Sequence, residues 1–221
     1  MTRDDFAEAE AACPAVSRET WERLRIHVDL LHRWQPTLNL VAPSTLSHVW
    51  TRHVADSLQL LPLAPEAGRW ADLGSGGGFP GLVIAIALAG RDGAMIELVE
   101  SDRRKAAFLA AAVRETAAPA RVHAERIEAW AAHWSEPVKV VTARALAPLE
   151  RLIPLALPLL GRGAVGLFPK GKSAAEELTA ASRGWHSSHR IVPSATDSAA
   201  GIVVLSDVRP RRTPPQEGRP P

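Results

Sequence analysis

The chain has little cysteine and no long apolar run among its 221 residues. Its single cysteine, Cys13, excludes an internal disulfide and a cysteine-cluster zinc site, and we expect no metal. No stretch reaches the roughly 18 uninterrupted apolar residues that indicate a transmembrane helix. The N-terminus carries acids early (Asp4, Asp5) and lacks an apolar segment of signal-peptide length. These absences favour a cytoplasmic protein that does not associate with a membrane.

The chain also has little excess of either sign of charge, since its formal net charge is only +2. This value is too small to indicate a nucleic-acid partner by itself. The basic residues nevertheless cluster at Arg103–Lys105, Lys170–Lys172 and Arg209–Arg212. Such clusters attract phosphate backbones, but a solvated surface explains any single one equally well.

The most informative segment is Trp70 to Gly81, which reads WADLGSGGGFPG. A short strand-like run ends at Asp72, a glycine-dense loop follows, and an apolar helix begins after Gly81. Glycine lets a backbone turn sharply and approach a ligand closely. A strand, a glycine loop and a helix in this order are typical of α/β sheets that hold a nucleotide-like cofactor at their strand ends.

Two cofactors compete for this loop. Gly76-x-Gly78-x-x-Gly81 matches the dinucleotide fingerprint, in which loop amides receive a pyrophosphate. Asp72 would place a second negative charge beside that anion. Its carboxylate instead suits the ammonium and sulfonium of S-adenosyl-L-methionine. Pro80 is unusual in a dinucleotide loop, although it is harmless in the first turn of a helix.

The pattern along the chain predicts an α/β fold. Residues 1–66 read as a helical N-terminal extension, with one helix from Ser17 that Pro36 ends and a second from Ser47 to Leu61. Residues 67–208 alternate strands with helices, which predicts a mostly parallel sheet covered on both faces. Residues 209–221 read as a disordered Pro/Arg-rich tail. Seven strands are expected, at 69–73, 94–99, 120–123, 138–141, 164–168, 190–192 and 202–205.

Ligands in such sheets bind beyond the carboxyl ends of the strands, so the residues after each strand are candidates. Glu100 follows the second strand and could accept hydrogen bonds from ribose hydroxyls, or it could cap the next helix. Ile127 could line an adenine while Glu128 meets its edge, and a simple surface helix start explains this pair as well.

The segment after the fourth strand, Thr142 to Leu149, lacks several catalytic devices. It has no N/D-P-P-Y/F run for an exocyclic amine, no cysteine to attack a pyrimidine, and no Lys-Asp-Lys-Glu set for a ribose hydroxyl. A lone pair such as guanine N7 needs no deprotonation, so positioning could be the main catalytic contribution. Arg144 would orient cofactor or base, because arginine keeps its proton; a sheet-edge ion pair is the alternative. We assign no catalytic residue.

Three further residues are candidates for contact with RNA. Arg52 and His53 lie in the extension with Asp56 one helical turn beyond His53, and a structural polar network is at least as good an explanation. Lys170 ends the fifth strand, where a phosphate or base contact competes with a solvated lysine.

Seven blocks in order are typical of one family: Leu31-His32-Arg33-Trp34 with Asn39-Leu40, Arg52 to Ser57, Asp72 to Gly81, Lys105 to Leu109, Arg126-Ile127-Glu128, Ala143-Arg144-Ala145 and Lys170-Gly171. In these blocks, which cover about residues 20–172, the chain resembles the bacterial small-subunit ribosomal RNA N7-guanine methyltransferases, also called glucose-inhibited division protein B. Phe79, in place of a common aliphatic residue, and Pro169 depart from the family pattern.

The resemblance implies a Rossmann-like class I methyltransferase that binds S-adenosyl-L-methionine. The family methylates N7 of one guanine, guanine 527, in the decoding-region loop of 16S rRNA. The implied partner is therefore 16S rRNA or a 30S-type particle, and we expect a monomer. The expected cofactor residues are Asp72, Gly74, Gly76, Phe79, Glu100, Ile127, Glu128 and Arg144. An NAD(P)-dependent oxidoreductase and a non-catalytic RNA-binding module are the alternatives.

Overall fold

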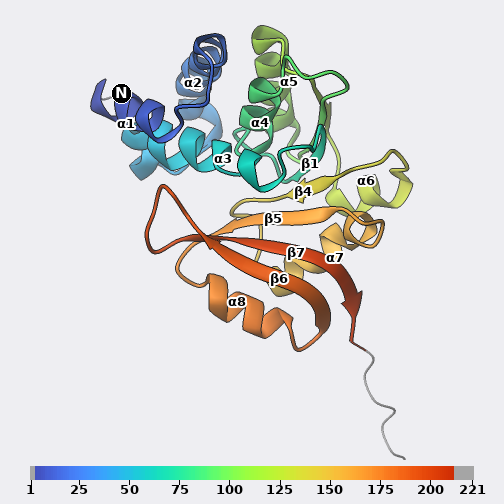
Figure 1. Cartoon of the computed structure of the whole chain (residues 1–221). Helices are drawn as coiled ribbons and strands as arrows, with labels where there is room; N and C mark the ends of the chain where they lie inside the picture. The colour runs from blue at the N-terminus through green and yellow to red at the C-terminus, as the bar shows by residue number, and fades with distance from the viewer. Residues whose placement is uncertain (1–2, 212–221) are drawn as a thin grey trace, which may run out of the picture.

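A seven-stranded sheet runs through the chain, whose computed structural model describes residues 3–211 (Figure 1). The strand order is β3-β2-β1-β4-β5-β7-β6. β7 is antiparallel to both of its neighbours, and the other neighbouring pairs are parallel. The expected Rossmann-like α/β fold with a mostly parallel seven-stranded sheet is confirmed. The strands are β1 (Arg69–Leu73), β2 (Met95–Val99), β3 (Ala120–His123), β4 (Val140–Thr142), β5 (Val165–Lys170), β6 (Trp185–Pro193) and β7 (Gly201–Pro210).

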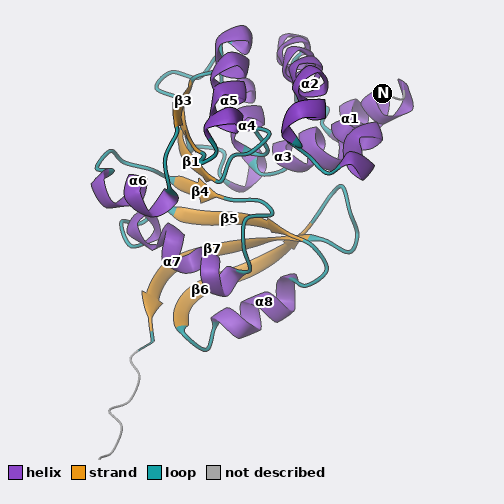
Figure 2. Cartoon of the chain, turned by 180° about the vertical axis from the view of Figure 1, so that it is seen from behind, coloured by secondary structure: helices purple, strands orange, loops and turns teal. Residues whose placement is uncertain are grey.

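Helices cover both faces of this sheet (Figure 2). Successive residues of a strand belong to two different apolar clusters, one on each face of the sheet. Trp70 packs in the cluster with the first helices, and Ala71 packs in the cluster with the later ones. Burial on both faces explains why the central strands are almost continuously apolar. No helix among residues 3–211 is long and apolar enough to cross a bilayer. The α-helices are α1 (Arg3–Ala12), α2 (Arg18–Leu38), α3 (Asp56–Leu58), α4 (Gly81–Ala87), α5 (Arg103–Thr116), α6 (Ile127–His133), α7 (Leu149–Leu160) and α8 (Ala174–Ala181).

Helix α2 begins where expected and ends later than expected. Ser17 caps it, because the Ser17 side chain accepts a hydrogen bond from the Thr20 amide at 3.2 Å. The prediction that Pro36 ends the helix is wrong, since α2 continues to Leu38. Pro36 removes one helical hydrogen bond, and the last turn is nevertheless closed by the Asn39 amide, which donates to the Gln35 carbonyl at 3.1 Å. The helix ends instead at Asn39, which takes a left-handed conformation with φ 46°.

The second expected helix, from Ser47 to Leu61, is broken into shorter pieces. The chain forms a 3₁₀-helix η1 (Pro43–His48), a π-helix η2 (Trp50–Ala55), the short α3 and a second 3₁₀-helix η3 (Leu61–Leu63). Helical periodicity alone cannot distinguish these forms. A π-helix is rare and occurs most often at functional sites.

Asp5 of α1 holds the start of η2. Its buried carboxylate accepts hydrogen bonds from the amides of Trp50 and Thr51 and from the Thr51 hydroxyl, at 2.9, 3.2 and 2.6 Å. The rings of Phe6, Trp21 and Trp50 pack edge-on or tilted beside this contact. The sequence analysis did not predict α1, although this contact shows that α1 supports the irregular segment.

The C-terminal strands are longer than the pattern predicts. β6 spans Trp185–Pro193, whereas the pattern predicts only 190–192. The prediction is too short because most residues of this strand are exposed and polar and carry no apolar signal. β7 continues to Pro210, so the prediction that the disordered tail begins at residue 209 is wrong at its start. Residues 212–221 of that tail lie outside the described residues. The boundary at residue 66 stays a prediction.

Replacing Asp5 should destabilise the protein through η2. In Asp5→Ala the buried Trp50 and Thr51 amides lose their acceptor, and we expect a loss of about 2 kcal/mol in the free energy of unfolding. Asp4→Ala, at an exposed neighbour on the same helix, is the control. Urea unfolding followed by tryptophan fluorescence measures both. Equal stability of the two variants would contradict this role of Asp5.

Candidate functional site

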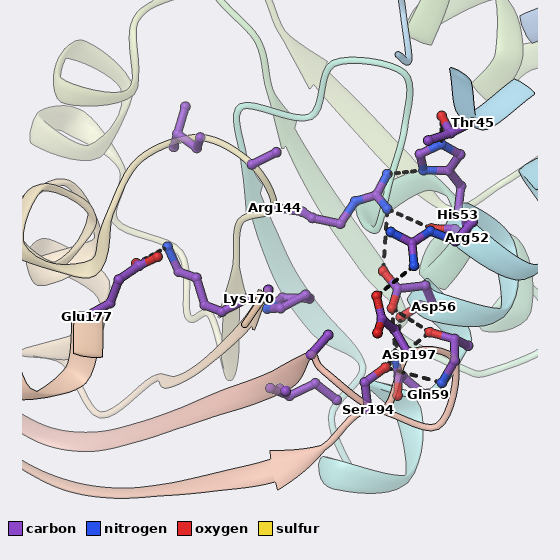
Figure 3. Close-up of a pocket in the computed structure, with 18 of the residues that line it drawn as sticks. Thr45, Arg52, His53, Asp56, Gln59, Arg144, Lys170, Glu177, Ser194 and Asp197 are labelled. Carbon is purple, nitrogen blue, oxygen red and sulfur yellow. Dashed lines mark hydrogen bonds and ion pairs between the residues drawn. The ribbon is translucent and has the colours of Figure 1, made fainter. Parts of the chain in front are cut away.

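Two cavities open beyond the carboxyl ends of the parallel strands. The glycine-loop cavity, of about 570 Å³, lies between the loop after β1, the end of β2 and the start of α6. The hairpin cavity, of about 540 Å³, lies between η2, the β4–α7 loop, the end of β5 and the β6–β7 loop (Figure 3). Both are lined by a shared wall of five residues: Thr45, His53, Arg144, Ala145 and Leu146. A group bound in one cavity therefore lies next to a group bound in the other.

The glycine loop after β1 is held in a fixed shape by backbone hydrogen bonds. The amides of Gly74 and Ser75 both donate to the Val99 carbonyl, at 2.9 and 3.1 Å. Gly76 has φ 52°, a conformation that favours glycine, and a Cβ there would meet almost nothing. Gly74 and Gly76 both line the glycine-loop cavity; the space beside Gly76 is open, whereas a Cβ at Gly74 would lie 2.8 Å from the Leu146 side chain.

Glu100 faces this cavity at the end of β2, as predicted. One carboxylate oxygen accepts from the Gly76 amide at 2.9 Å and the other from the Asp102 amide at 2.8 Å. A carboxylate has about four lone-pair positions, so it can accept further hydrogen bonds from ribose hydroxyls. Asp102, not Glu100, caps α5, because its side chain accepts from the amides of Arg104 and Lys105.

Asp72 lies behind the loop and does not line either cavity. It is fully buried, and its Oδ2 accepts from the Gly81 amide at 3.0 Å. Burial raises the pKa of Asp72 to about 7, and the Gly81 hydrogen bond opposes part of that shift. A Cβ at Gly81 would lie 2.5 Å from the Asp72 Cβ, so only glycine fits there. Asp72 therefore connects β1 to the start of α4 instead of facing a ligand directly.

Ile127 and Phe79, two further predicted cofactor residues, form the apolar side of the glycine-loop cavity. Ile127 and Glu128 line it at the start of α6, with the Glu128 side chain 54 % exposed. Phe79 is buried, and its ring lies between those of His27 and His53, at centroid distances of 5.0 and 4.9 Å. This cavity thus combines apolar surface with the Glu100 carboxylate, as a nucleoside would require.

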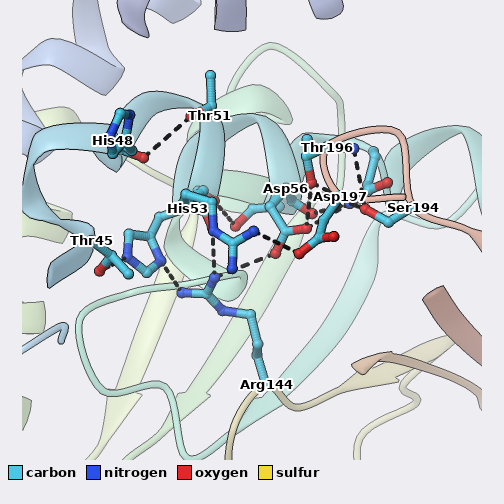
Figure 4. Close-up of polar contacts among 12 residues, drawn as sticks. Thr45, His48, Thr51, His53, Asp56, Arg144, Ser194, Thr196 and Asp197 are labelled. Carbon is cyan, nitrogen blue, oxygen red and sulfur yellow. Dashed lines mark hydrogen bonds and ion pairs between the residues drawn. The ribbon is translucent and has the colours of Figure 1, made fainter. Parts of the chain in front are cut away.

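Arg144 connects the β4–α7 loop to η2 through His53 (Figure 4). Its Nη2 lies 2.6 Å from His53 Nδ1, and His53 Nε2 lies 2.7 Å from Thr45 Oγ1. Since a guanidinium only donates, His53 Nδ1 must accept and His53 must be the neutral Nε2–H tautomer. Burial, with Arg144 and Arg52 nearby, lowers the pKa of His53 to about 3, which agrees with the neutral form. Thr45 in turn donates to the Ala42 carbonyl at 2.8 Å.

Asp56 compensates the charge of Arg144 and fixes the β6–β7 loop. Its Oδ2 lies 3.3 Å from Arg144 Nη1, with both side chains less than one-fifth exposed. Its Oδ1 accepts from Gln59 Nε2 and from the Thr196 hydroxyl, at 2.7 and 2.9 Å. Arg52 reaches the same loop by an ion pair with Asp197 at 2.7 Å. The polar network considered for this region therefore exists, and it spans both cavities.

Lys170 lines the hairpin cavity, but its ammonium already has protein partners. Lys170 Nζ donates to the Ala147 carbonyl at 2.6 Å and pairs with Glu177 Oε2 at 2.9 Å. The same Glu177 oxygen accepts from the Leu149 amide at 2.9 Å. Lys170 and Glu177 thus support the β4–α7 loop. Among residues 3–211 no group of three or more His, Cys, Asp or Glu side chains could hold a metal ion.

His27, which is not among the residues predicted for the site, joins the extension to the glycine loop. His27 is fully buried in α2, and its Nε2 donates to the Gly77 carbonyl at 2.9 Å. Burial lowers the pKa of His27 to about 4. The available signal was a histidine on the apolar face formed by Leu24, Val28 and Leu31.

Comparisons with known proteins identify relatives over most of the chain. Residues 20–202 match the family model described as rRNA small subunit methyltransferase G. A protein of that name from Methylorubrum populi is 57 % identical over 193 residues, which cover 87 % of this chain and 91 % of that protein. Another of that name, from Bradyrhizobium sp. strain ORS 278, is 50 % identical over 212 residues, or 95 % and 96 % of the two chains.

Solved structures of low sequence identity share the fold. An O-methyltransferase from Bacillus cereus in complex with SAH has a TM-score of 0.57 and 12 % identity, and covers 94 % of this chain and 100 % of its own. A mutant of MtNAS in complex with S-adenosylmethionine has a TM-score of 0.54 and 13 % identity, and covers 91 % and 83 %.

His27 should make the protein less stable in mild acid. Its folded-state pKa lies below the ordinary value, so between about pH 6.5 and 4 only the unfolded state binds the proton and stability falls as pH falls. In His27→Gln, which keeps a donor for Gly77, the loss between pH 7.5 and pH 5 should shrink by about 2 kcal/mol. Urea titrations at both pH values measure this. The exposed His186→Gln serves as the control, and an identical loss in both variants would refute the role of His27.

Proposed function

The chain belongs to the rRNA small subunit methyltransferase G family, and from this membership we propose that it methylates N7 of a single guanine, guanine 527, in the decoding-region loop of 16S rRNA. Membership makes the chain an S-adenosyl-L-methionine-dependent rRNA methyltransferase. It therefore decides against the oxidoreductase and the non-catalytic RNA-binding module.

The observation that carries the N7 proposal is the absence of a free base on the shared wall. His53 Nδ1 accepts from Arg144, and His53 Nε2 already donates to Thr45. Arg144 cannot give up its proton under ordinary conditions. Asp56, which lines the hairpin cavity beside the wall, already accepts from Arg144, Gln59 and Thr196. The shared wall therefore offers no free acceptor to a nucleophile that must lose a proton, whereas guanine N7 attacks with a lone pair.

The proposed transfer balances without a proton acceptor. S-adenosyl-L-methionine supplies a methyl group that a sulfonium makes electrophilic. As the N7–methyl bond forms, the sulfur keeps the electron pair of the broken bond, and the positive charge passes to the guanine. The protein's contribution is to hold the two reactants in line, and rigid placement of this kind can account for a large share of a methyl-transfer barrier.

The glycine-loop cavity is the proposed cofactor site. Glu100 would accept hydrogen bonds from the ribose, while Ile127 and Phe79 provide apolar surface for the rest of the nucleoside. Gly74 and Gly76 let the ligand approach the backbone, and Glu128 lies at the cavity edge. Asp72 would act from behind the loop by holding its shape. The free lone pairs of Glu100 and the open space at Gly76 fit this cofactor.

For the RNA side we assign different roles to the three predicted residues. Arg52 is the best placed for a phosphate or base, because its side chain is 49 % exposed at the hairpin cavity. His53 and Lys170 would act by positioning, since their polar atoms are already bonded to the protein. A 30S-type particle as substrate and a monomeric enzyme complete the proposal.

Chemical cleavage at N7-methylguanine tests the target. Treated 16S rRNA from cells with the gene should break at guanine 527, and rRNA from cells lacking it should not. Primer extension reads the position. Reintroducing the gene should restore the break. Cleavage that persists after deletion would show that another enzyme makes this modification, and the proposal would fail.

Glu100→Gln should weaken cofactor binding. The amide keeps the shape of the side chain but loses the charge and one of the two acceptors that hold Gly76 and Asp102. We expect the dissociation constant for S-adenosylhomocysteine to rise about 10-fold or more, as loss of a charge-assisted hydrogen bond implies. Isothermal titration calorimetry measures it, with Glu115→Gln at the far end of α5 as the control. Unchanged affinity in Glu100→Gln would remove Glu100 from the site.

A further inference from the structure

The hairpin cavity has a polar wall that the cofactor proposal does not use. The cavity shares His53, Arg144 and Leu146 with the glycine-loop cavity. It is also lined by the β6–β7 loop, through Ser194, Thr196 and Asp197. A molecule that receives a methyl group at the shared wall therefore also lies within reach of the β6–β7 loop.

Hydrogen bonds to Gln59 and Asp56 hold this loop in place. Gln59 Oε1 accepts from the Ala195 amide at 2.8 Å, and the Thr196 hydroxyl donates to Asp56 at 2.9 Å. Asp56 is the residue that also pairs with Arg144. The loop and the shared wall are thus tied to the same carboxylate, which fixes the relative position of the two sides of the cavity.

Asp197 presents a charged acceptor in this loop (Figures 3 and 4). Its Oδ2 pairs with Arg52 at 2.7 Å, and its Oδ1 accepts from the Ala199 amide at 3.0 Å. The Arg52 hydrogen bond holds the pKa of Asp197 below its usual value, so the carboxylate stays ionised. Its side chain is 32 % exposed, and two of its roughly four lone-pair positions remain free.

The edges of guanine match this arrangement. N7 and O6 lie on one edge of the base, and the N1–H and N2–H₂ donors lie on the neighbouring Watson–Crick edge. A guanine with N7 at the shared wall can therefore turn both donors toward the β6–β7 loop. A carboxylate accepts from such a pair, whereas adenine has an acceptor at N1 and would face it unfavourably.

We infer that the hairpin cavity binds the methyl-accepting guanine and that Asp197 accepts hydrogen bonds from its N1–H and N2–H₂ groups, with Arg52 orienting the carboxylate. This inference rests on the proposed N7 target. It makes Asp197 a specificity-determining residue, while the shared wall serves the methyl transfer itself.

Replacing the target guanosine by inosine tests the inference, because inosine lacks only the N2 amino group. The substrate is a 30S particle, reconstituted with 16S rRNA that carries guanosine or inosine at the target position, and kcat/KM is measured from transfer of radiolabelled methyl. The wild-type protein should favour guanosine about 10-fold, the discrimination expected of a paired hydrogen-bond contact to a base. In Asp197→Asn this ratio should fall toward 1, because an amide cannot accept from both donors.

Two controls separate recognition from folding. Asp207→Asn removes the same charge from an exposed position of β7 that lines neither cavity, and should keep the wild-type ratio. Asp197→Asn should keep the affinity for S-adenosylhomocysteine, because Asp197 does not line the glycine-loop cavity.

Two outcomes would contradict the inference, and a third would contradict the proposed function. A guanosine-to-inosine ratio that Asp197→Asn leaves unchanged, even with both rates lowered, would overturn the inference, because a structural loss affects both substrates alike. A wild-type ratio near 1 would overturn it as well. If the wild-type protein forms no N7-methylguanine on the guanosine particle, the proposed function itself fails.

Discussion

The contact of the Arg144 guanidinium with His53 and Asp56 is the constraint on which the rest of the site depends. It joins three segments far apart in the chain: the β4–α7 loop, η2 and, through Asp56, the β6–β7 loop. Because the guanidinium only donates, it also fixes the tautomer of His53. Burying a guanidinium without a carboxylate partner would cost free energy of folding, so the buried position of Arg144 requires Asp56.

The same contact explains why the helical extension belongs to the site. His53 and Thr45 form part of the wall between the cavities, and His27 holds the glycine loop by its bond to Gly77. Phe79, in the glycine loop, packs between the two histidine rings. The predicted boundary at residue 66 therefore marks a change in sequence pattern and not a separation of function. A sheet domain without the extension would lack part of both cavities.

The sheet could be predicted from the sequence, whereas the polar network could not. β1 and β3 have the expected bounds because Gly68 and Gly74 flank β1 and Pro119 precedes β3, which leaves a local signal. The start of the π-helix is bonded to Asp5, about 45 residues earlier, and no local window contains this contact. Asp72 shows a related limit: the sequence located an acid at a strand end, but only the fold shows that its side chain turns toward Gly81. Pairings such as Arg144 with His53 join residues 91 positions apart.

Charge balance at the shared wall is as important for methyl transfer as its shape. The proposed reaction moves a positive charge onto guanine, close to Arg144. Two like charges a few ångströms apart repel by about 4 kcal/mol at an effective dielectric constant of 20, so an uncompensated arginine would oppose the reaction. Asp56, at 3.3 Å from Arg144, offsets that repulsion, and neutral His53 adds none. An arginine can thus serve as a rigid donor on this wall because its charge is already paired with the Asp56 carboxylate.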